Sequence, residues 1–420
     1  MFASVIALSI SASVVMLGFG IIMPYLPVYA QILGANTGLD IGLLSSAFLI
    51  TRTFLATPSG SISDRIGRKK MIMAGLFLYT AVSILFGLSQ TWIELLIYRS
   101  IQGIASAMVW PPSTALLADL TPAGKRGSAM GLYNSISMAG WVIGPGIGAT
   151  IQWYSKNVLS LSLIDSFRIP FYVSSIFSAV ALVLVYVTVK APQSANPPVR
   201  KTSLIKMPFK EINGKFRKTI FAMLFVAVSY GFATSFVDPM LVYFAQHEYN
   251  LTADEVTASM GVIFSISGIA MLGIQFYAGR LADRFSKKKL IAIFTTLAQV
   301  SSIAMPFSGN VTNIGIMMTL RSSLYSLTSP AYTALQQDLF PKKTRGLLTG
   351  LFDTAFGLGS VLGPVVSFII YDTISHGMPF ILSGVLGIIT VLILVLVAKE
   401  PSLEEMKEIA SEVRKNGESD

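Results

Sequence analysis

Five ionisable residues lie inside long apolar stretches of this 420-residue chain, where a charged side chain is costly. They are Arg52, Arg99, Asp238, Arg321 and Asp353. In an apolar interior a charge is retained where it faces a cavity or pairs with another group, so each residue is a candidate for proton or ion chemistry. The two carboxylates are the members of this set that could take up and release a proton.

Asp238 is the preferred proton carrier, because it stands directly before Pro239, which permits a bend in its segment. A carboxylate that moves between a dry environment and the neighbourhood of an arginine can take up and release a proton. A fixed structural ion pair is the competing interpretation for Asp238. Asp353 is the second candidate. It lies about two turns into its own segment, nearer the end that is expected to face the cytoplasm.

A second group of residues could contact a cargo. It comprises Arg52, Arg321, Gln102, Tyr230, Phe236 and Tyr325. Aromatic side chains suit a promiscuous apolar pocket, although any one of them could simply pack helices. Arginines outnumber carboxylates in the apolar stretches, which keeps an anionic or zwitterionic cargo open.

The composition argues against catalysis and against a bound cofactor. The chain has no cysteine and only two histidines, so disulfide, thiol and iron–sulfur chemistry are excluded and a metal site is not expected. No phosphate-binding loop of the Gly-x4-Gly-Lys-Ser/Thr kind is present, and no nucleophile stands with a base. We therefore expect neither an enzyme nor a cofactor.

The apolar residues are arranged in blocks that could cross a membrane. Hydrophobic residues make up 53% of the chain, charged residues 12%, and the mean hydropathy is +0.67. Each block has about 20 residues, enough to cross about 30 Å of hydrocarbon. The first block lacks a basic leader and is too long for a signal peptide, so it is expected to be a retained helix. The sequence predicts an all-α integral membrane protein with twelve spans, at 4–33, 41–62, 71–89, 92–117, 128–152, 169–189, 219–246, 255–279, 290–308, 312–336, 346–371 and 378–398.

Basic residues predict the orientation. Most of the 31 Lys and Arg residues fall in segments on the side of the two termini, whereas Lys156 and Arg168 fall on the other. The positive-inside rule therefore puts both termini in the cytoplasm, with the chain in the cell (inner or plasma) membrane. This distribution accounts for the net charge of +10, so nucleic-acid binding is not needed to explain it. Residues 190–218 are expected to be a basic cytoplasmic linker, and 400–420 a cytoplasmic amphipathic tail.

The two halves of the chain match at a fixed offset of 219 residues. Gly60, Asp64 and Arg65 recur as Gly279, Asp283 and Arg284, and Gly140, Gly144 and Pro145 recur as Gly359, Gly363 and Pro364. The match predicts two pseudo-symmetric six-helix bundles, 1–189 and 219–399. Parallel repeats of this kind are typical of transporters that bind near the membrane midplane and work by alternating access.

Each half carries a charged loop after its second span. The first reads Gly60-Ser-Ile-Ser-Asp64-Arg65-Ile-Gly67-Arg68-Lys69-Lys70. A carboxylate beside clustered arginines can form charge-assisted bonds that hold helices together and break when they move. We expect a conformational latch, although topogenic charge alone would explain the basic residues. Its residues are Gly60, Asp64, Arg65, Gly67, Arg68, Asp283 and Arg284.

These motifs resemble those of the major facilitator superfamily across nearly the whole chain. The first loop looks like that family's signature loop, and Leu95-x3-Arg99-x2-Gln102-Gly103 is similar to its second motif. Leu17-Gly18-x5-Pro24-x2-Pro27 resembles the first-helix motif of the twelve-helix drug/proton antiporter branch. By this resemblance Arg99 takes part in proton coupling. The alternative is a buried arginine satisfied by backbone carbonyls.

The fifth span carries a glycine motif similar to the one that marks antiporters in this family. It reads Gly140-x3-Gly144-Pro145-x2-Gly148-Ala149, with Ala149 where a glycine is usual. Small residues on one face allow helices to approach closely, and Pro145 permits a bend. Helix packing alone is the alternative explanation.

Together these features predict a secondary active transporter, a proton-coupled antiporter that exports amphipathic small molecules of the multidrug type. Export or flipping of an anionic metabolite or lipid stays open, as does proton-coupled nutrient import. A membrane sensor or scaffold on a transporter fold is the alternative outside transport. The expected partners are a small-molecule substrate, protons and the lipid bilayer, with no nucleic acid, and the chain is expected to be a monomer.

Overall fold

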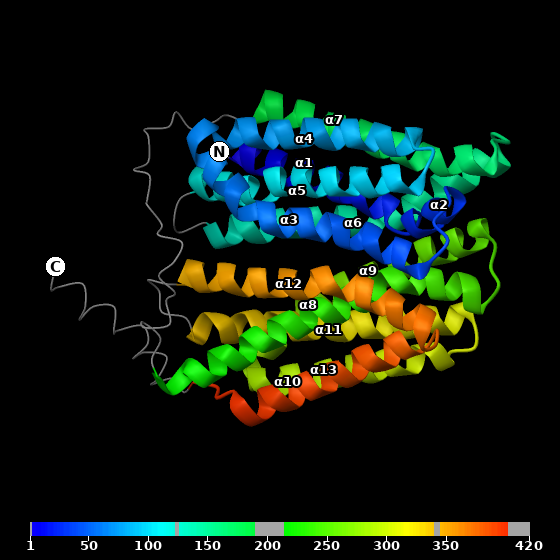
Figure 1. Ribbon diagram of the computed structural model, residues 1–420. Helices are drawn as coiled ribbons and strands as arrows, with labels where there is room; N and C mark the ends of the chain where they lie inside the picture. The colour runs from blue at the N-terminus through cyan, green and yellow to red at the C-terminus, as the bar shows by residue number, and fades with distance from the viewer. Residues whose placement is uncertain (1, 122–125, 190–213, 340–344, 402–420) are drawn as a thin grey trace. The chain divides into compact units, whose positions relative to one another are not determined.

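The computed structural model describes residues 2–121, 126–189, 214–339 and 345–401 (Figure 1). Every regular element within these ranges is helical, which confirms the predicted all-α fold. The elements are α1 (Phe2–Ile22), α2 (Leu26–Ile32), α3 (Gly38–Ile66), α4 (Arg68–Leu88), α5 (Trp92–Leu120), α6 (Arg126–Asn157), α7 (Leu163–Thr188), α8 (Gly214–Glu248), α9 (Ala253–Arg284), α10 (Lys287–Ala304), the short 3-10 helix η3 (Met305–Phe307), α11 (Val311–Leu339), α12 (Arg345–Thr373) and α13 (Met378–Val397).

The predicted linker 190–218 and the predicted tail 400–420 lie mostly outside the described residues. Of the linker 190–218 only residues 214–218 are described, and they form the start of α8. Of the tail 400–420 only Glu400 and Pro401 are described. The cytoplasmic linker and the amphipathic tail therefore stay predictions.

The first predicted span, 4–33, consists of two helices rather than one. The chain turns at Met23, Pro24 and Tyr25, and α2 begins at Leu26 with Pro27 in its first turn. Proline lacks the N–H that would continue the helix ladder and disfavours helical geometry in the residue before it, so two prolines in this spacing break α1. The predicted span 290–308 is formed by α10 and the short helix η3, and each of the other predicted spans corresponds to one long helix.

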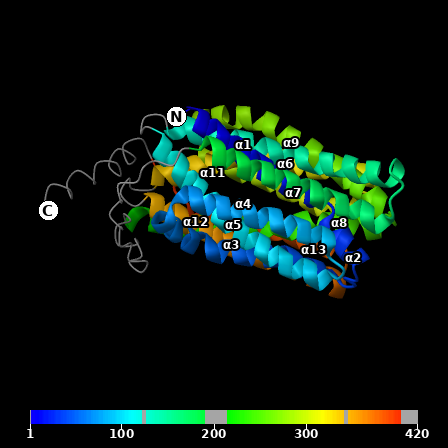
Figure 2. The same cartoon turned by 90° about the horizontal axis from the view of Figure 1, so that it is seen from above.

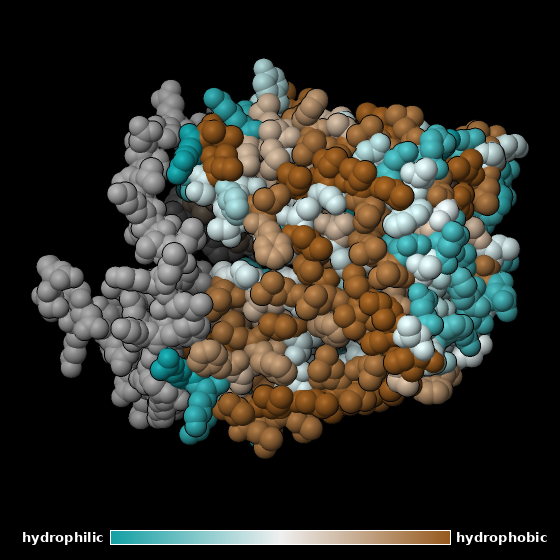
Figure 3. Space-filling model, viewed as in Figure 1, coloured by the Kyte–Doolittle hydropathy of each residue, from teal (hydrophilic) through white to brown (hydrophobic). Residues whose placement is uncertain are grey.

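Most of the helices are suited to a hydrocarbon environment. Within the described residues, nine helices are long and apolar enough to cross a membrane. The exceptions of comparable length are α5, α6 and α11, which have 29, 32 and 29 residues but more polar side chains. Figure 3 shows apolar side chains over the middle of the exposed helix faces and hydrophilic ones gathered toward the helix ends. This distribution is the one expected for helices that contact lipid.

Contacts between residues divide the chain into two compact units. Unit 1 comprises Met1–Pro197, Asp238–Gly268 and Pro364–Thr373, and unit 2 comprises Pro198–Val237, Ile269–Gly363 and Ile374–Asp420. Each of α8, α9 and α12 therefore contributes to both units. The predicted division into bundles 1–189 and 219–399 follows the sequence repeat rather than these contacts and stays a prediction.

In unit 1, α1 packs against α6 and α7, while α5 packs against α3 and α4. Figures 1 and 2 both show α3, α5 and α4 side by side. The core between these helices includes the buried side chains of Tyr79, Val109, Leu117, Tyr133 and Val185. Interior packing of this kind fixes the rotation of each helix, and with it the direction of the polar side chains.

In unit 2, α10 packs against α11 and α13. One end of the unit is closed by a core that includes Met223, Leu290, Leu335, Phe352 and Leu394. The side chains of Met223 and Phe352 come from α8 and α12, and Ala282 of α9 belongs to the same core, so six helices meet around it.

Candidate functional site

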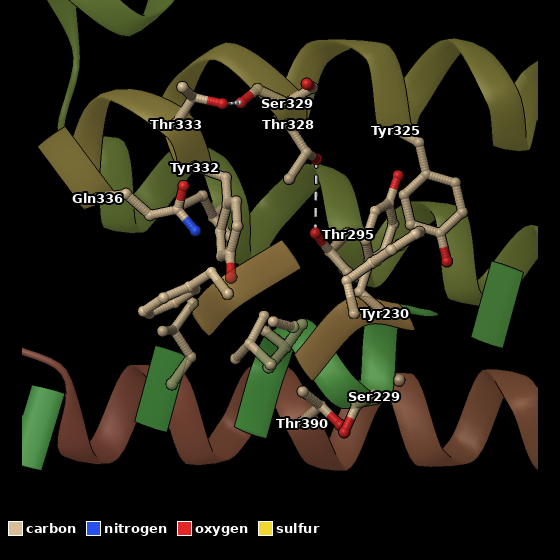
Figure 4. A pocket seen from close by; sticks show the side chains of 18 of the residues that line it. Ser229, Tyr230, Thr295, Tyr325, Thr328, Ser329, Tyr332, Thr333, Gln336 and Thr390 are labelled. Atoms are coloured by element: carbon tan, nitrogen blue, oxygen red, sulfur yellow. Dashed lines mark hydrogen bonds between the residues drawn. The ribbon is translucent and has the colours of Figure 1, made fainter. Parts of the chain in front are cut away.

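Unit 2 contains a cavity of about 220 Å³ between α8, α10, α11, α12 and α13 (Figure 4). Much of its polar lining comes from one face of α11, which explains why that helix is less apolar than its neighbours. Residues three and four apart share a helix face, and the lining follows that spacing. From α11 the lining residues are Tyr325, Thr328, Ser329, Tyr332, Thr333 and Gln336; from the other helices they include Ser229, Tyr230, Thr295, Gln299, Phe352, Asp353, Phe356 and Thr390.

Aromatic rings form much of the apolar wall. The rings of Tyr230 and Tyr325 meet edge to face with centroids 5.1 Å apart, and those of Tyr230 and Phe356 lie 5.8 Å apart. The Tyr332 hydroxyl donates to the backbone oxygen of Met223 at 3.1 Å. Tyr230 and Tyr325 were expected from the sequence to face a cargo, and both line the cavity. The arrangement suits a planar apolar ligand, because aromatic rings stack and contact edges favourably.

Asp353 is the one formally charged residue among the described residues that line this cavity. It lies on α12 with an exposed side chain, two turns from the start of the helix. Asp353 interacts electrostatically with Tyr332 across the cavity wall. A carboxylate among aromatic rings and hydroxyl groups is an arrangement that attracts a cation or a proton.

Two of the expected cargo residues, Arg321 and Phe236, do not line the cavity. Arg321 is 2% exposed, and its guanidinium carbon lies 5.1 Å from the centre of the Tyr325 ring. Its Nη2 donates to the backbone oxygen of Ala233 at 3.4 Å. Phe236 is buried and packs against Phe232 at 4.9 Å. Arg321 therefore supports the wall from outside the cavity, whereas Phe236 packs within unit 2 away from the lining residues.

Arg99 and Gln102 are buried together in unit 1. The Arg99 Nη1 donates to Gln102 Oε1 at 2.6 Å, and the guanidinium carbon lies 5.0 Å from the ring centre of Phe48 and 5.4 Å from that of Phe19. Arg52 is exposed and also lies near the Phe48 ring, at 6.0 Å. A guanidinium held over aromatic faces is attracted by the electron density of the rings.

Asp238 is half-buried on α8, in the part of that helix that belongs to unit 1. The helix continues through Pro239. Asp353 belongs to unit 2, so the two candidate proton carriers lie in different units. Their roles stay predictions.

The first charged loop forms a network at one end of unit 1. Arg68 donates to Asp64 at 3.0 Å and to the Ala115 backbone oxygen at 2.9 Å, and it also pairs with Asp119 of α5. Gly67 has φ 101°, a conformation that side chains rarely adopt, and it allows the tight turn between α3 and α4. Gly60 and Arg65 belong to the same end of α3, and Arg65 is exposed. Sequence reasoning did not assign Asp119 to this network.

The second charged loop repeats one ion pair of this network in unit 2. Lys287 pairs with Asp338 of α11, and these two residues lie 219 positions after Arg68 and Asp119. Asp283 and Arg284 end α9 with exposed side chains. In place of the glycine, Ser286 donates to Glu400 at 2.6 Å. The repeat at Asp119 and Asp338 was the available signal for the missed partners.

The glycine motif brings α6 and α1 into close contact. A Cβ on Gly144 would lie 2.8 Å from the Leu17 backbone oxygen, and one on Gly148 would lie 2.7 Å from the Ile21 oxygen. At Gly140 a Cβ would overlap the Ser13 backbone oxygen. The helix continues through Pro145. The expected small-residue face is therefore a backbone-to-backbone contact.

A further contact within unit 1 joins α6 to α9. Lys156 pairs with Asp254, and the Gln152 amide donates to the same carboxylate at 2.7 Å. Directly after Pro145, the backbone N–H of Gly146 donates to Ser265 Oγ at 2.8 Å. These polar contacts link two helices that are far apart in the sequence.

Comparisons with known proteins agree with this arrangement. A family model of the Major Facilitator Superfamily matches residues 8–320 and 223–415. The chain is 27% identical over 381 residues to Multidrug resistance protein 2 of Bacillus subtilis (strain 168), with 90% of each protein covered. It is 25% identical over 388 residues to Quinolone resistance protein NorA of Staphylococcus aureus (strain COL), with 90% of this chain and 93% of that protein covered.

A solved structure has the same fold. The crystal structure of a D-xylose-proton symporter matches with a TM-score of 0.77 at 15% identity, covering 95% of this chain and 98% of that one. At this identity the likeness concerns the fold alone. The family match spans nearly the whole chain and confirms the resemblance seen in the motifs. The chain therefore belongs to the major facilitator superfamily of membrane transporters.

Proposed function

We propose that this transporter exports amphipathic small molecules, cations above all, in exchange for protons. The observation that carries the proposal is the cavity of unit 2, where aromatic rings and hydroxyl groups surround a single carboxylate, Asp353. Two relatives named for multidrug and quinolone resistance support an export function. The proposed mechanism is alternating access, with both termini in the cytoplasm of a cell membrane and the chain working as a monomer.

The placement of the arginines favours a cationic cargo over an anionic one. Arg321 lies behind Tyr325, and Arg99 lies under Phe19 and Phe48 with its Nη1 bonded to Gln102. Neither guanidinium lines the cavity of unit 2, so an anion there would meet a carboxylate without a compensating positive charge.

In this proposal the Asp353 carboxylate binds either a proton or the cationic cargo, and Asp238 is a second proton carrier. Protonation of Asp353 would remove the attraction for a cation, so that proton entry and cargo release are linked. Asp238 would carry the proton in the other unit, and Arg99 would take part in the coupling there. The network around Arg68 would hold one conformation, and the glycine contacts of α6 would let the helices move as rigid bodies.

The test is transport in proteoliposomes under an imposed pH gradient, with a panel of lipophilic cations and organic anions. Asp353→Asn and Asp238→Asn are compared with wild type, and Asp372→Asn is the control, because it changes an exposed carboxylate at the far end of α12. We expect cation movement driven by the gradient, a loss of at least tenfold in Asp353→Asn, and wild-type rates in the control.

Two results would contradict the proposal. Gradient-driven movement of anions alone would reassign the protein as an exporter of anionic metabolites or lipids. Undiminished proton-coupled cation transport in Asp353→Asn would show that this carboxylate does not bind the cargo, and equal transport in Asp238→Asn would leave that residue structural.

A further inference from the structure

The cavity of unit 2 contains one polar side chain that the proposed function does not yet explain. Gln299 of α10 lines the cavity and is 2% exposed. Its Nε2 donates to the Tyr325 hydroxyl at 2.8 Å. Among the described residues no group donates to its Oε1, which is fully buried.

The neighbouring helix is shaped to hold this amide in place. A Cβ on Gly387 of α13 would overlap the Gln299 amide and lie 2.6 Å from its Cγ. One turn earlier, a Cβ on Gly384 would lie 2.8 Å from the Gln299 backbone oxygen. Two glycines thus leave the space that Gln299 occupies, so the amide has little freedom to turn away from the cavity.

A buried carbonyl oxygen without a donor is unfavourable, because it has lost its hydrogen bonds to water without replacement. Such groups are rare in folded proteins, and one in a cavity wall points to a ligand that completes the bond. The second cavity glutamine, Gln336, differs in this respect, because its amide reaches the Tyr332 hydroxyl.

We propose that Gln299 is a specificity-determining residue, which accepts a hydrogen bond from an N–H group of a planar aromatic cation bound in this cavity. The inference rests on the proposed function, in which Asp353 attracts the charge of the cargo. Tyr230, Tyr325 and Phe356 contact the ring, and the Oε1 of Gln299 separates ligands that carry an N–H donor from those whose nitrogens are fully alkylated.

The probes are two phenothiazinium dyes with the same charge, thionine and methylene blue. Thionine carries exocyclic NH2 groups, whereas methylene blue carries dimethylamino groups at the same positions and has no N–H. Binding of each dye to the purified full-length protein is followed by dye fluorescence anisotropy. The quantity compared is the ratio of the two dissociation constants, which a general loss of folded protein does not change.

We expect wild type to bind thionine more tightly than methylene blue by roughly 5- to 30-fold, the effect of leaving one buried acceptor unpaired. In Gln299→Met this ratio falls toward 1, because the acceptor is absent. Gly387→Ala displaces the amide at its flexible end and lowers the ratio in the same way. The matched comparison is Gln336→Met, which removes the other cavity amide. Because the Gln336 amide already bonds to Tyr332, its loss can weaken binding of both dyes but leaves the ratio of their dissociation constants at the wild-type value.

The outcomes separate this inference from the proposed function. A wild-type ratio near 1, or an unchanged ratio in Gln299→Met, would overturn the role of Gln299 and leave cation export standing. If neither dye binds wild type, the inference and the cationic cargo are both wrong. An equal fall of the ratio in Gln336→Met would also contradict the assignment, because the effect would then belong to cavity polarity in general.

Discussion

The contact between α6 and α1 gives a prediction whose size can be worked out from the structure. A Cβ on Gly140 would overlap the Ser13 backbone oxygen and lie 2.9 Å from its carbonyl carbon, where ordinary contact begins at 3.4 Å. Because these atoms are backbone, α1 itself would have to move. Overpacking of this kind costs about 1–3 kcal/mol. The higher helix propensity of alanine stabilises the helix by about 1 kcal/mol relative to glycine and partly offsets this cost.

The same helix offers a matched control. A Cβ on Gly131 would meet no atom within 4 Å, so Gly131→Ala receives the propensity gain without the clash. The difference in stability between Gly131→Ala and Gly140→Ala therefore isolates the packing cost of about 1–3 kcal/mol. For a unit of 150–250 residues this corresponds to a lower melting temperature of Gly140→Ala by roughly 2–4 °C per kcal/mol.

Thermal unfolding in detergent, followed by tryptophan fluorescence, measures this difference. Trp141 of α6 stacks on Phe19 of α1 at 5.4 Å and so reports on the same contact. If Gly140→Ala melts no lower than Gly131→Ala, the close approach of the two helices is refuted.

The repeat supplies an independent pair in the second half. A Cβ on Gly359 would overlap the Val228 backbone oxygen, whereas one on Gly350 would meet nothing within 4 Å. Gly359→Ala should therefore also melt lower than Gly350→Ala. Transport per folded molecule then distinguishes the two explanations of the motif: if it is unchanged in Gly140→Ala, the motif serves helix packing alone.

Two further changes test the polar networks. Asp119→Asn should leave the melting temperature nearly unchanged, because partly exposed ion pairs such as that with Arg68 contribute only about 0–1 kcal/mol to stability. The same change should slow transport several-fold. Transport at the wild-type rate would exclude a latch. Lys156→Met removes the ion pair with Asp254 that joins α6 to α9. Because this pair is also partly exposed, its loss should shift the equilibrium between conformations by roughly two- to fivefold. Since the chain has no cysteine, one cysteine can be introduced near the end of α6 and one near the end of α9, and both can carry spin labels. The distance between the two labels measures the shift, and an unchanged distance would contradict it.

Hydropathy and the repeat predicted the helices well, because both depend on features local to each segment. A run of apolar residues predicts a crossing whatever its neighbours are, and glycine spacing predicts a face that can approach another helix. The break after Ile22 was missed in spite of Pro24 and Pro27, because membrane helices often continue through proline, as α6 does through Pro145.

The partners of polar side chains were harder to predict, because they depend on how each helix is rotated by its packing. Arg321 and Tyr325 are one turn apart on α11, yet Tyr325 lines the cavity and Arg321 lies behind it. Gln299 has no sequence signal of its own, since a single glutamine in an apolar helix is compatible with many environments. Its role emerges only from Gly387 on another helix.

The repeat also indicates where the two halves differ in chemistry. The mechanical contacts recur at the same offset, as Lys287 and Asp338 do after Arg68 and Asp119. Most of the cavity residues differ between the copies, although Thr333 recurs as Thr114 and Ile291 as Ile72. Gln336 stands where the first copy has Leu117, which is fully buried in the core of unit 1. Further replacements include Tyr332 for Ser113, Thr328 for Val109 and Asp353 for Asn134.

At these positions the second copy has a polar side chain in place of an apolar one at Gln336 and Thr328, a larger hydroxyl-bearing side chain at Tyr332, and a carboxylate in place of an amide at Asp353. Because a duplicated unit needs the same contacts to fold and move, residues shared by both copies report on architecture. Residues that become polar in one copy are expensive in a membrane and are retained where they contact a ligand. Comparing the copies position by position therefore supports the proposal that the α11 face and Asp353 contact the cargo, a distinction that hydropathy alone does not make.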